Sequence, residues 1–257
     1  ALAAAAAAAA AASAPAGDEE EEVVVVQNAA DCAARIGALI DAGEPVAVDY
    51  EGIDLCRAGE LCIVQLAPRA GPVLLIDVST LGWYAFYSGR LKELLESDRV
   101  LKLIYDGRAD ADVLFHRHHV YPRNQYDIQV AYCTKRDWDA YRRDPFVKGL
   151  GHAMRACPGI SEAKKAELEA NKNEGRAMFA PERGGSYEVW KTRPLPPVLI
   201  KYAAADVTYL HTMYDAWREY VPHEIMLFIV SWRIHHAVNN PNPAKGREMA
   251  MKDFPTM

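Results

Sequence analysis

The sequence predicts an α/β protein in which a mixed β-sheet carries helices on its faces. Three apolar runs with short links follow one another early in the chain, which indicates an antiparallel meander of strands. Helical and strand patterns then alternate, and further helical patterns follow them. At 257 residues, 51% of them hydrophobic, the chain is long enough to bury a sizeable core in one large domain or two small ones.

Strands are expected where a short apolar run of β-prone residues lies between turn residues. The expected strands are Val23–Val26, Val46–Tyr50, Leu61–Leu66, Val73–Ile76 and Val100–Tyr105, with Gln125–Ile128 as a further candidate. The turn Pro68–Pro72, rich in proline and glycine, joins the third of these strands to the fourth.

Helices are expected where apolar residues recur every three or four positions. Asn28 or Asp31 caps the first helix, which ends near Gly43. The others are expected at Leu91–Leu95, Arg108–His118, Asp127–Thr134, Phe146–Cys157, Ser161–Asn171 and Pro197–Tyr220, with one more starting at Pro222. One side of that last helix is expected to close the domain through Ile225, Phe228, Ile229 and Trp232. Residues 172–196 read as a long loop because they are rich in Gly, Pro and charge, and the chain from Asn239 reads as irregular.

Three segments are expected along the chain. Residues 1–22 form a low-complexity tail, an alanine tract followed by acids, which we expect to be disordered or loosely helical and which makes a poor secretion signal. Residues 23–220 form the main domain, and residues 221–257 form a C-terminal helix and an irregular tail. Because the sequence begins without methionine, an upstream part is expected to be missing.

Charge and cysteine content limit the kinds of binding site and cellular compartment that the sequence allows. The formal net charge is −6, but the run Asp18–Glu22 is entirely acidic, so the remainder is nearly neutral. Any phosphate must therefore meet a local basic patch or a bound metal. The five cysteines include no C-x-x-C pair, which indicates reduced, partly buried thiols in an intracellular protein, cytoplasmic or nuclear. No apolar run approaches the roughly 20 residues that span a bilayer.

The strongest candidate site lies at the end of the strand Val46–Tyr50, where the chain reads Asp49-Tyr50-Glu51. Side chains alternate faces along a strand, so Asp49 and Glu51 stand side by side. Two such carboxylates repel each other unless a cation lies between them, and Mg²⁺ favours carboxylate oxygens. Taken alone, the same pattern also fits an acidic strand end that runs into a solvated turn.

Further acids lie at the ends of other elements. Asp110 falls in the first turn of the helix after Gly107, where the helix dipole favours a carboxylate, although Asp106 or Asp110 would also serve as a cap. Tyr202 and Asp206 are four residues apart and share a helix face, with three alanines between them that allow close packing. The alternative for Tyr202 is a half-buried aromatic of the core.

Together these residues resemble the DEDDy group of 3′–5′ exonucleases, which have a ribonuclease D-like domain. Residues 193–210, R-P-L-P-P-V-L-I-K-Y-A-A-A-D-V-T-Y-L, are similar to the third motif of that family. The stretch V-A-V-D-Y-E-G is similar to the first motif, from whose common leucine Tyr50 departs, and residues 103–114, L-I-Y-D-G-R-A-D-A-D-V-L, are similar to the second. The insert at 175–190, G-R-A-M-F-A-P-E-R-G-G-S-Y-E-V-W, resembles exonuclease domain proteins of fungi and plants.

The resemblance covers about residues 23–220 and implies a ribonuclease H-like fold with a five-stranded mixed sheet flanked by helices. It implies a metal-dependent 3′–5′ exonuclease that hydrolyses phosphodiester bonds at the 3′ end of a single strand with two ions, Mg²⁺ or Mn²⁺. The ligands of these ions would be Asp49, Glu51, Asp110 and Asp206.

Each of these residues has a role by the same resemblance. Asp49 bridges both ions, Glu51 and Asp206 complete the site that activates water, and Asp110 serves the second ion. Tyr202 orients the attacking water, because a phenol with a pKa near 10 suits an orienter better than a base. The competing candidates for the position of Asp110 are Asp106 and Asp112.

Substrate contacts are expected after residue 172, where basic and aromatic residues alternate in a way that suits a single strand: Arg183, Tyr187, Trp190, Lys191 and Arg193. The alternative is a solvated loop whose aromatics anchor it to the core. The histidines of 116–119 do not share a helix face, which disfavours a metal site there.

The competing hypothesis for the function is a catalytically silent nuclease fold that binds RNA or acts as a scaffold. An unrelated α/β enzyme would need a P-loop, a G-x-G-x-x-G or a G-x-S-x-G motif, and the sequence has none. The sequence predicts no membrane partner and leaves open both the choice between RNA and DNA and the oligomeric state.

Overall fold

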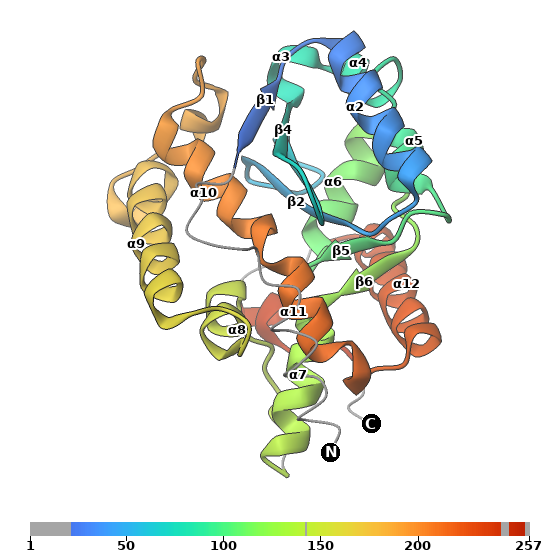
Figure 1. Cartoon of the computed structure of the whole chain (residues 1–257), viewed down its shortest axis with the longest axis vertical. Coiled ribbons are helices and arrows are strands. Elements are labelled where there is room, and N and C mark those ends of the chain that lie inside the picture. Colours follow the sequence, from blue (N-terminus) through green and yellow to red (C-terminus); the bar gives the residue numbers. More distant parts are fainter. Residues whose placement is uncertain (1–21, 142, 243–246, 255–257) are drawn as a thin grey trace.

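A computed structural model describes residues 22–141, 143–242 and 247–254, so the expected tail lies outside the described residues except for Glu22. Figure 1 shows a β-sheet between layers of helices. The strands are β1 (Val23–Val26), β2 (Val46–Ile53), β3 (Glu60–Pro68), β4 (Val73–Asp77), β5 (Lys102–Ile104) and β6 (Gln125–Asp127). The α-helices are α2 (Ala29–Ala42), α3 (Val78–Leu81), α4 (Trp83–Phe86), α5 (Leu91–Glu96), α6 (Arg108–His118), α7 (Ile128–Asp139), α8 (Leu150–Ala156), α9 (Glu162–Phe179), α10 (Pro197–Thr208), α11 (Leu210–Trp217), α12 (His223–Asn239) and α13 (Arg247–Ala250). Short 3₁₀ helices are η1 (Pro181–Arg183), η2 (Tyr187–Lys191) and η3 (Arg218–Tyr220).

The sheet is mixed, as expected. In the described part of the chain its order is β1-β4-β3-β2-β5-β6, with β2, β3 and β4 antiparallel and the other neighbours parallel. It has six strands where the resemblance implied five, because β1 pairs in parallel along β4, with Val24 opposite Leu74. The candidate strand near Gln125 is confirmed as β6, which extends the sheet beside β5.

Helices cover both faces of this sheet. In Figure 1, α10 and α11 lie on one face with α9 outside α10, and α2 and α5 lie on the other face. The start of α2 is fixed by Asn28, whose side chain accepts hydrogen bonds from the backbone N–H groups of Ala30 and Asp31. The same helix ends at Gly43, which has the left-handed φ of 69° that favours glycine.

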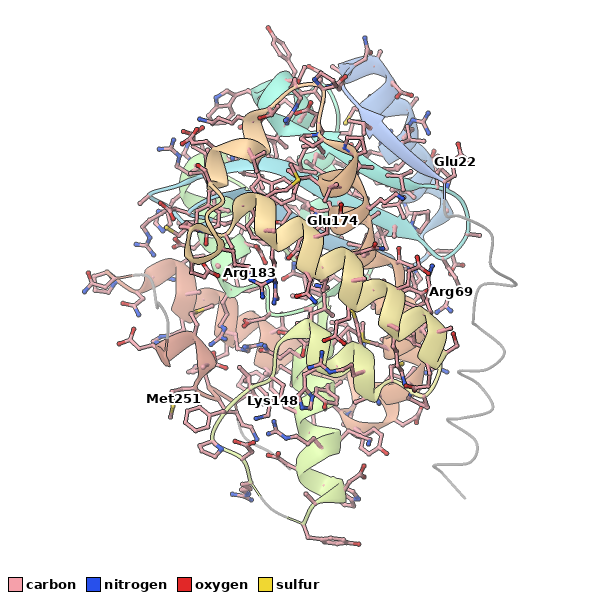
Figure 2. The ribbon with its side chains drawn as sticks, turned by 90° about the vertical axis from the view of Figure 1, so that its left-hand side faces the viewer. Glu22, Arg69, Lys148, Glu174, Arg183 and Met251 are labelled. Atoms are coloured by element: carbon pink, nitrogen blue, oxygen red, sulfur yellow. The ribbon has the colours of Figure 1, made fainter. Side chains whose placement is uncertain are left out.

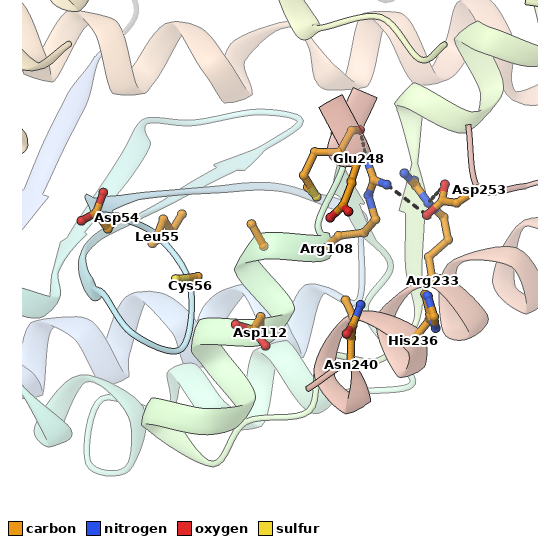
Figure 3. Close-up of a pocket in the computed structure, with 13 residues that line it drawn as sticks. Asp54, Leu55, Cys56, Arg108, Asp112, Arg233, His236, Asn240, Glu248 and Asp253 are labelled. Atoms are coloured by element: carbon orange, nitrogen blue, oxygen red, sulfur yellow. Dashed lines mark hydrogen bonds and ion pairs between the residues drawn. The ribbon is translucent and has the colours of Figure 1, made fainter. Parts of the chain in front are cut away.

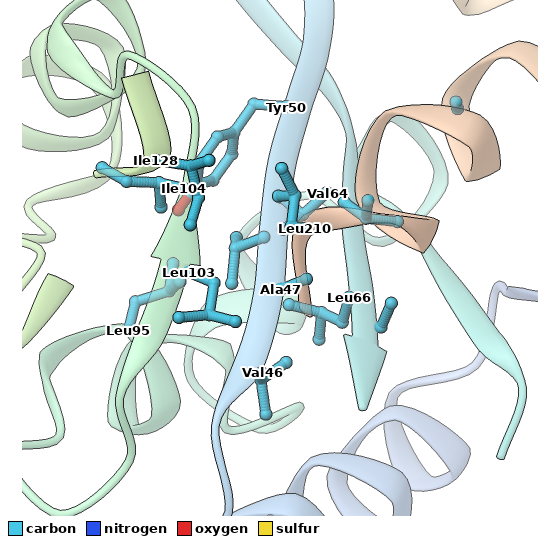
Figure 4. Close-up of a cluster of buried hydrophobic side chains, with 14 of the residues drawn as sticks. Val46, Ala47, Tyr50, Val64, Leu66, Leu95, Leu103, Ile104, Ile128 and Leu210 are labelled. Atoms are coloured by element: carbon cyan, nitrogen blue, oxygen red, sulfur yellow. The ribbon is translucent and has the colours of Figure 1, made fainter. Parts of the chain in front are cut away.

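The central strand β2 is packed on both sides along its length. Figure 4 shows Val46 and Ala47 of β2 between Leu66 of β3 and Leu103 of β5, and all four side chains are buried. Tyr50 is also buried, and its hydroxyl has no hydrogen-bond partner among the described residues. A strand held in this way presents the acids at its end from a rigid position.

Two expectations for the helices are wrong. Residues 172–196 are not a long loop, because α9 continues to Phe179 and η1 and η2 follow it. The helix expected over Pro197–Tyr220 is interrupted at Tyr209, which separates α10 from α11. The additional length of α9 has a physical reason, since Leu168, Lys172 and Gly175 are buried on one helix face.

The C-terminal helix α12 packs against α6 and β6, but not through the side that was expected. Of the four apolar residues proposed to close the domain, only Ile229 is buried. Ile225, Phe228 and Trp232 are 38%, 73% and 47% exposed. The buried face is instead formed by Met226, Ile229, Val230, Arg233, Ile234 and Val238.

The five cysteines are all buried and unpaired, as expected. None of the described helices combines the length and the hydrophobicity that crossing a membrane requires.

Candidate metal and active site

Three carboxylates from two distant parts of the chain meet at the end of β2. One oxygen each from Asp49, Glu51 and Asp206 lies within 4.8 Å of the others. Asp49 and Glu51 share a face of β2, and Asp206 comes from α10, which packs across β2, β3 and β4. The close approach of α10 depends on the buried alanines 203–205, as the sequence predicts.

The electrostatics of this cluster favour a bound cation. Burial raises the pKa of Asp49 to about 8, and the charge of Asp206 adds to the effect while Lys172 opposes it. Burial and the charge of Asp49 raise the pKa of Glu51 well above its usual value. These carboxyl groups repel each other when ionised, and the all-oxygen ligand set suits a hard divalent ion.

Tyr202 and Lys172 complete the cluster. Tyr202 is 6% exposed, with its ring centroid 5.2 Å from that of Phe179 and 6.2 Å from that of Trp190. Lys172 of α9 forms an ion pair with Asp206, and its Nζ lies 5.3 Å from the centre of the Tyr202 ring. Burial and the charge of Asp206 raise the pKa of Tyr202, so the phenol stays protonated at neutral pH.

Lys172 is a site residue that the sequence analysis did not place at the acids, because residue 172 was taken as the start of a loop. The available signal was the helical spacing of Leu168, Lys172, Gly175 and Phe179, which marks one buried face. Gly175 is required on that face, because a Cβ there would lie 2.4 Å from Cδ2 of Tyr202.

Asp110 lies near these acids but outside the group of three. Burial and the charge of Asp49 raise its pKa well above the usual value. Both competing candidates are held by arginines, Asp106 by Arg108 at 2.6 Å and Asp112 by Arg57 at 2.5 Å. Among the described residues no ion pair is found for Asp110, which leaves its carboxylate available to a cation.

Neither Asp106 nor Asp110 caps α6, since Gly107 occupies the N-cap and no side chain bonds there. Burial acts to raise the pKa of Asp106, but hydrogen bonds from Arg108 and the charge of Arg233 lower it below its usual value.

The expected substrate residues divide into two groups. Trp190 is 0% exposed, so no face of its ring is open to a base, and Arg193 holds Asp77 through Nε and Nη2, both at 2.5 Å. Lys191 is exposed and pairs with Glu60 at 2.8 Å.

Figure 2 shows α9 across the front of the molecule, with Glu174 on it and Arg183 in the turn beyond. Arg183 is exposed and Tyr187 half-buried, so both reach the surface beside the site.

A pocket of about 550 Å³ lies beside α6 and is shown in Figure 3. Its guanidinium groups are already engaged, because Arg108 and Arg233 both bind Asp253. The two arginines of the pocket therefore belong to a polar network that joins α6, α12 and the C-terminal segment.

The fold and the acid cluster define a ribonuclease H-like α/β domain with a candidate divalent-cation site. Residues 23–139 match the family model described as 3′-5′ exonuclease. Mouse piRNA biogenesis protein EXD1 is 34% identical over 170 residues, which cover 64% of this chain and 27% of that protein. Ribonuclease D of Nitrobacter hamburgensis is 25% identical over 158 residues, which cover 61% of this chain and 33% of that protein. This chain thus corresponds to about a third or less of the length of either relative.

Solved structures show the same fold. Trypanosoma brucei RNase D in complex with GMP superposes with a TM-score of 0.71 at 20% identity, covering 91% of this chain and 68% of that one. Its complex with RNA U12 gives a TM-score of 0.69 at 18% identity, covering 99% and 79%. The sequence comparisons thus show similarity to 3′–5′ exonuclease domains over residues 23–139 and to a ribonuclease D over 158 residues. These two sequence relatives come from an animal and a bacterium, and the expected kinship with fungal and plant proteins stays a prediction.

Proposed function

We propose that this protein is a divalent-metal-dependent 3′–5′ exonuclease that removes nucleotides from the 3′ end of single-stranded nucleic acid. The observation that carries the proposal is the meeting of Asp49, Glu51 and Asp206 within 4.8 Å beside the buried phenol of Tyr202. RNA is the substrate we favour, because a structural neighbour, the RNase D of Trypanosoma brucei, was solved with RNA U12.

The residues would hold two ions, Mg²⁺ or Mn²⁺, through Asp49, Glu51, Asp110 and Asp206. When bound, such ions supply positive charge to the attacking water and to the departing oxygen in an in-line displacement. Asp49 would be shared by both ions, because it lies within 4.8 Å of Glu51 and Asp206 and its charge also acts on Asp110.

The reaction is a hydrolysis. Water attacks the terminal phosphorus, the bond to the 3′ oxygen of the preceding nucleotide breaks, and that oxygen takes up a proton, which releases a nucleoside 5′-monophosphate. Tyr202 would orient the water through its hydroxyl, because its raised pKa keeps the phenol protonated. The rings of Phe179 and Trp190, which pack against Tyr202, limit the positions that its hydroxyl can take.

The direct test is incubation of 5′-labelled RNA and DNA strands with Mg²⁺ or Mn²⁺. We expect a ladder of products shortened from the 3′ end, lost on addition of EDTA and lost in Asp49→Asn. Asp98→Asn is the matched control, since Asp98 is an exposed acid paired only with Arg123 at 3.3 Å among its described ion pairs. Shortening by Asp49→Asn at the wild-type rate would overturn the proposal.

A catalytically silent fold that binds RNA is the second candidate, and one observation favours it. Lys172 already neutralises Asp206, a carboxylate that a metal would need. Isothermal titration of the metal-free protein with Mn²⁺ separates the two. Saturable binding that Asp49→Asn abolishes supports the exonuclease, whereas RNA binding that EDTA leaves unchanged, without turnover, supports the silent fold.

A further inference from the structure

A second groove lies at the end of the sheet where β3 begins and β4 ends. Its volume is about 670 Å³. Residues from five separate elements line it, and those that carry the argument are Glu60, Trp83, Arg117, His118, Lys191 and Arg193. The proposed exonuclease chemistry uses none of them.

Flat aromatic faces are exposed at the rim of this groove. Trp83 and Tyr87 of the α4 region are 51% and 54% exposed, and their rings stack with centroids 5.9 Å apart at 22°. The ring of His118 stacks on Phe86 at 4.3 Å. The Nδ1 of His118 is buried at the groove without a hydrogen-bond partner among the described residues, so a polar group there is available to a ligand.

The charge of the groove is opposite to that of the whole chain, whose formal net charge is −6. Its lining residues include three basic side chains, those of Arg117, Lys191 and Arg193, and one carboxylate, that of Glu60. Arg193 is neutralised by the buried carboxylate of Asp77, and Lys191 is neutralised by Glu60, so the excess positive charge of the groove comes from Arg117. No ion pair is found for Arg117 in the described part of the chain, so its guanidinium is available to a phosphate.

The groove is linked to the acid cluster through η2 and β2. Trp190 of η2 packs against Tyr202, and the next residue, Lys191, lies in the groove. Glu60 pairs with Ile53, two residues beyond Glu51 in β2, and two strand residues span about 7 Å. The edge of the groove at Glu60 therefore lies close to the end of β2 that carries Glu51.

We infer that this groove binds the body of a single-stranded nucleic acid whose 3′ end lies at the acid cluster, with bases stacked on Trp83 and Tyr87 and a phosphate on Arg117. Stacked aromatic faces beside the guanidinium group of Arg117 match the two recurring features of single strands, the bases and the phosphates. The direction of the nucleic-acid strand in this inference rests on the proposed function. The binding of a single strand in the groove does not depend on it.

Binding is measured by fluorescence anisotropy of a 5′-labelled RNA of about 12 nucleotides in EDTA, where no hydrolysis takes place. Trp83→Ala is expected to weaken binding roughly tenfold, and Trp83→Phe to restore most of it, because stacking needs only a flat ring. The matched control is Trp138→Ala, since Trp138 is 64% exposed on α7, at the far end of the molecule from α4 (Figure 1), and its removal should leave the Kd unchanged.

Arg117→Gln gives an independent readout. Loss of one phosphate contact is expected to reduce the slope of log Kd against log salt by about 0.7. An unchanged Kd in Trp83→Ala together with an unchanged slope in Arg117→Gln would overturn the inference, even if the wild type shortens RNA. Weaker binding in these variants, with no shortening by the wild type, would retain the groove and reject the exonuclease.

Discussion

The ammonium group of Lys172 is paired with the carboxylate of Asp206 while its Nζ lies 5.3 Å from the centre of the Tyr202 ring. One side chain of α9 thus contacts both an acid that would hold a cation and the phenol that would orient water. The ammonium group of Lys172 neutralises part of the negative charge of the cluster. A divalent ion would therefore have to compete with it for Asp206.

Lys172→Met is expected to tighten Mn²⁺ binding by roughly tenfold, because a like charge near the ion is removed. Isothermal titration of the EDTA-stripped protein measures this change. Lys165→Met serves as the control on the same helix, since Lys165 pairs with Glu162 at 2.7 Å. Weaker Mn²⁺ binding in Lys172→Met would show instead that the lysine supports the site.

Tyr202→Phe is expected to lower kcat roughly 100-fold, since the attacking water loses its orienting hydroxyl. The Kd for Mn²⁺ should not change, because Tyr202 is not among the proposed ligands. Single-turnover rates at saturating metal, measured beside titrations of the same preparation, test both statements. A rate within a factor of about two of the wild type would remove Tyr202 from the reaction.

Gly175→Ala tests the same phenol from the neighbouring helix. The new Cβ would stand 2.4 Å from Cδ2 of Tyr202, so the ring or α9 must move. We expect kcat to fall while Mn²⁺ binding persists, and the free energy of unfolding to drop by about 1–3 kcal/mol from overpacking. Gly184→Ala is not a suitable control because its φ of 84° is strained for alanine, whereas Gly149→Ala meets no atom within 4 Å.

Arg233→Met is expected to lower the free energy of unfolding by roughly 3–5 kcal/mol, because a buried carboxylate network loses its cation. Arg233 is 1% exposed and pairs with Asp106, Asp127 and Asp253. Chemical denaturation measures the loss. The exposed pair of Arg123 and Asp98 provides a comparison, and Arg123→Met should change stability by less than about 1 kcal/mol.

Lys102 makes stability depend on pH. It is 0% exposed, its Nζ donates to the carbonyls of Ser97 and Val100 at 2.5 and 2.9 Å, and burial lowers its pKa to about 7 from 10.5. Between these pH values the unfolded chain binds a proton that the folded chain does not, so the free energy of unfolding rises with pH.

Lys102→Met should remove this dependence, so its stability relative to the wild type should be greater at about pH 6.5 than at about pH 9.5, by roughly 3 kcal/mol. Denaturation at about pH 6.5 and about pH 9.5 tests the sign. Lys201→Met, at an exposed lysine, should follow the wild-type curve at both pH values.

The mixed sheet, the pairing of Asp49 with Glu51 and the shared helix face of Tyr202 and Asp206 could be predicted from local patterns in the sequence, whereas the meeting of the two sets was expected from the family resemblance alone. Lys172 and the end of α9 were missed for a different reason. Glycine, asparagine and charge in that stretch indicate a loop by composition, whereas contact with Tyr202 and Asp206 stabilises a helix there. Tertiary packing overrode local propensity.

The decision between Asp106, Asp110 and Asp112 also depended on distant residues. Arg233 and Arg57, far from these acids in sequence, hold Asp106 and Asp112. No spacing rule within 106–112 contains that information. The burial of Trp190 and the pairing of Arg193 with Asp77 likewise follow from contacts across the fold.

Asp106 forms ion pairs with Arg108, at the start of α6, and with Arg233 of α12. The turn that leads into Asp110 is therefore anchored to a helix that lies beyond residues 23–139, which match the family model. The position of Asp110 thus depends on α12 as well as on the residues beside it in the sequence. A substitution in α12 that breaks this contact is therefore expected to shift Asp110 without changing any of the proposed metal ligands.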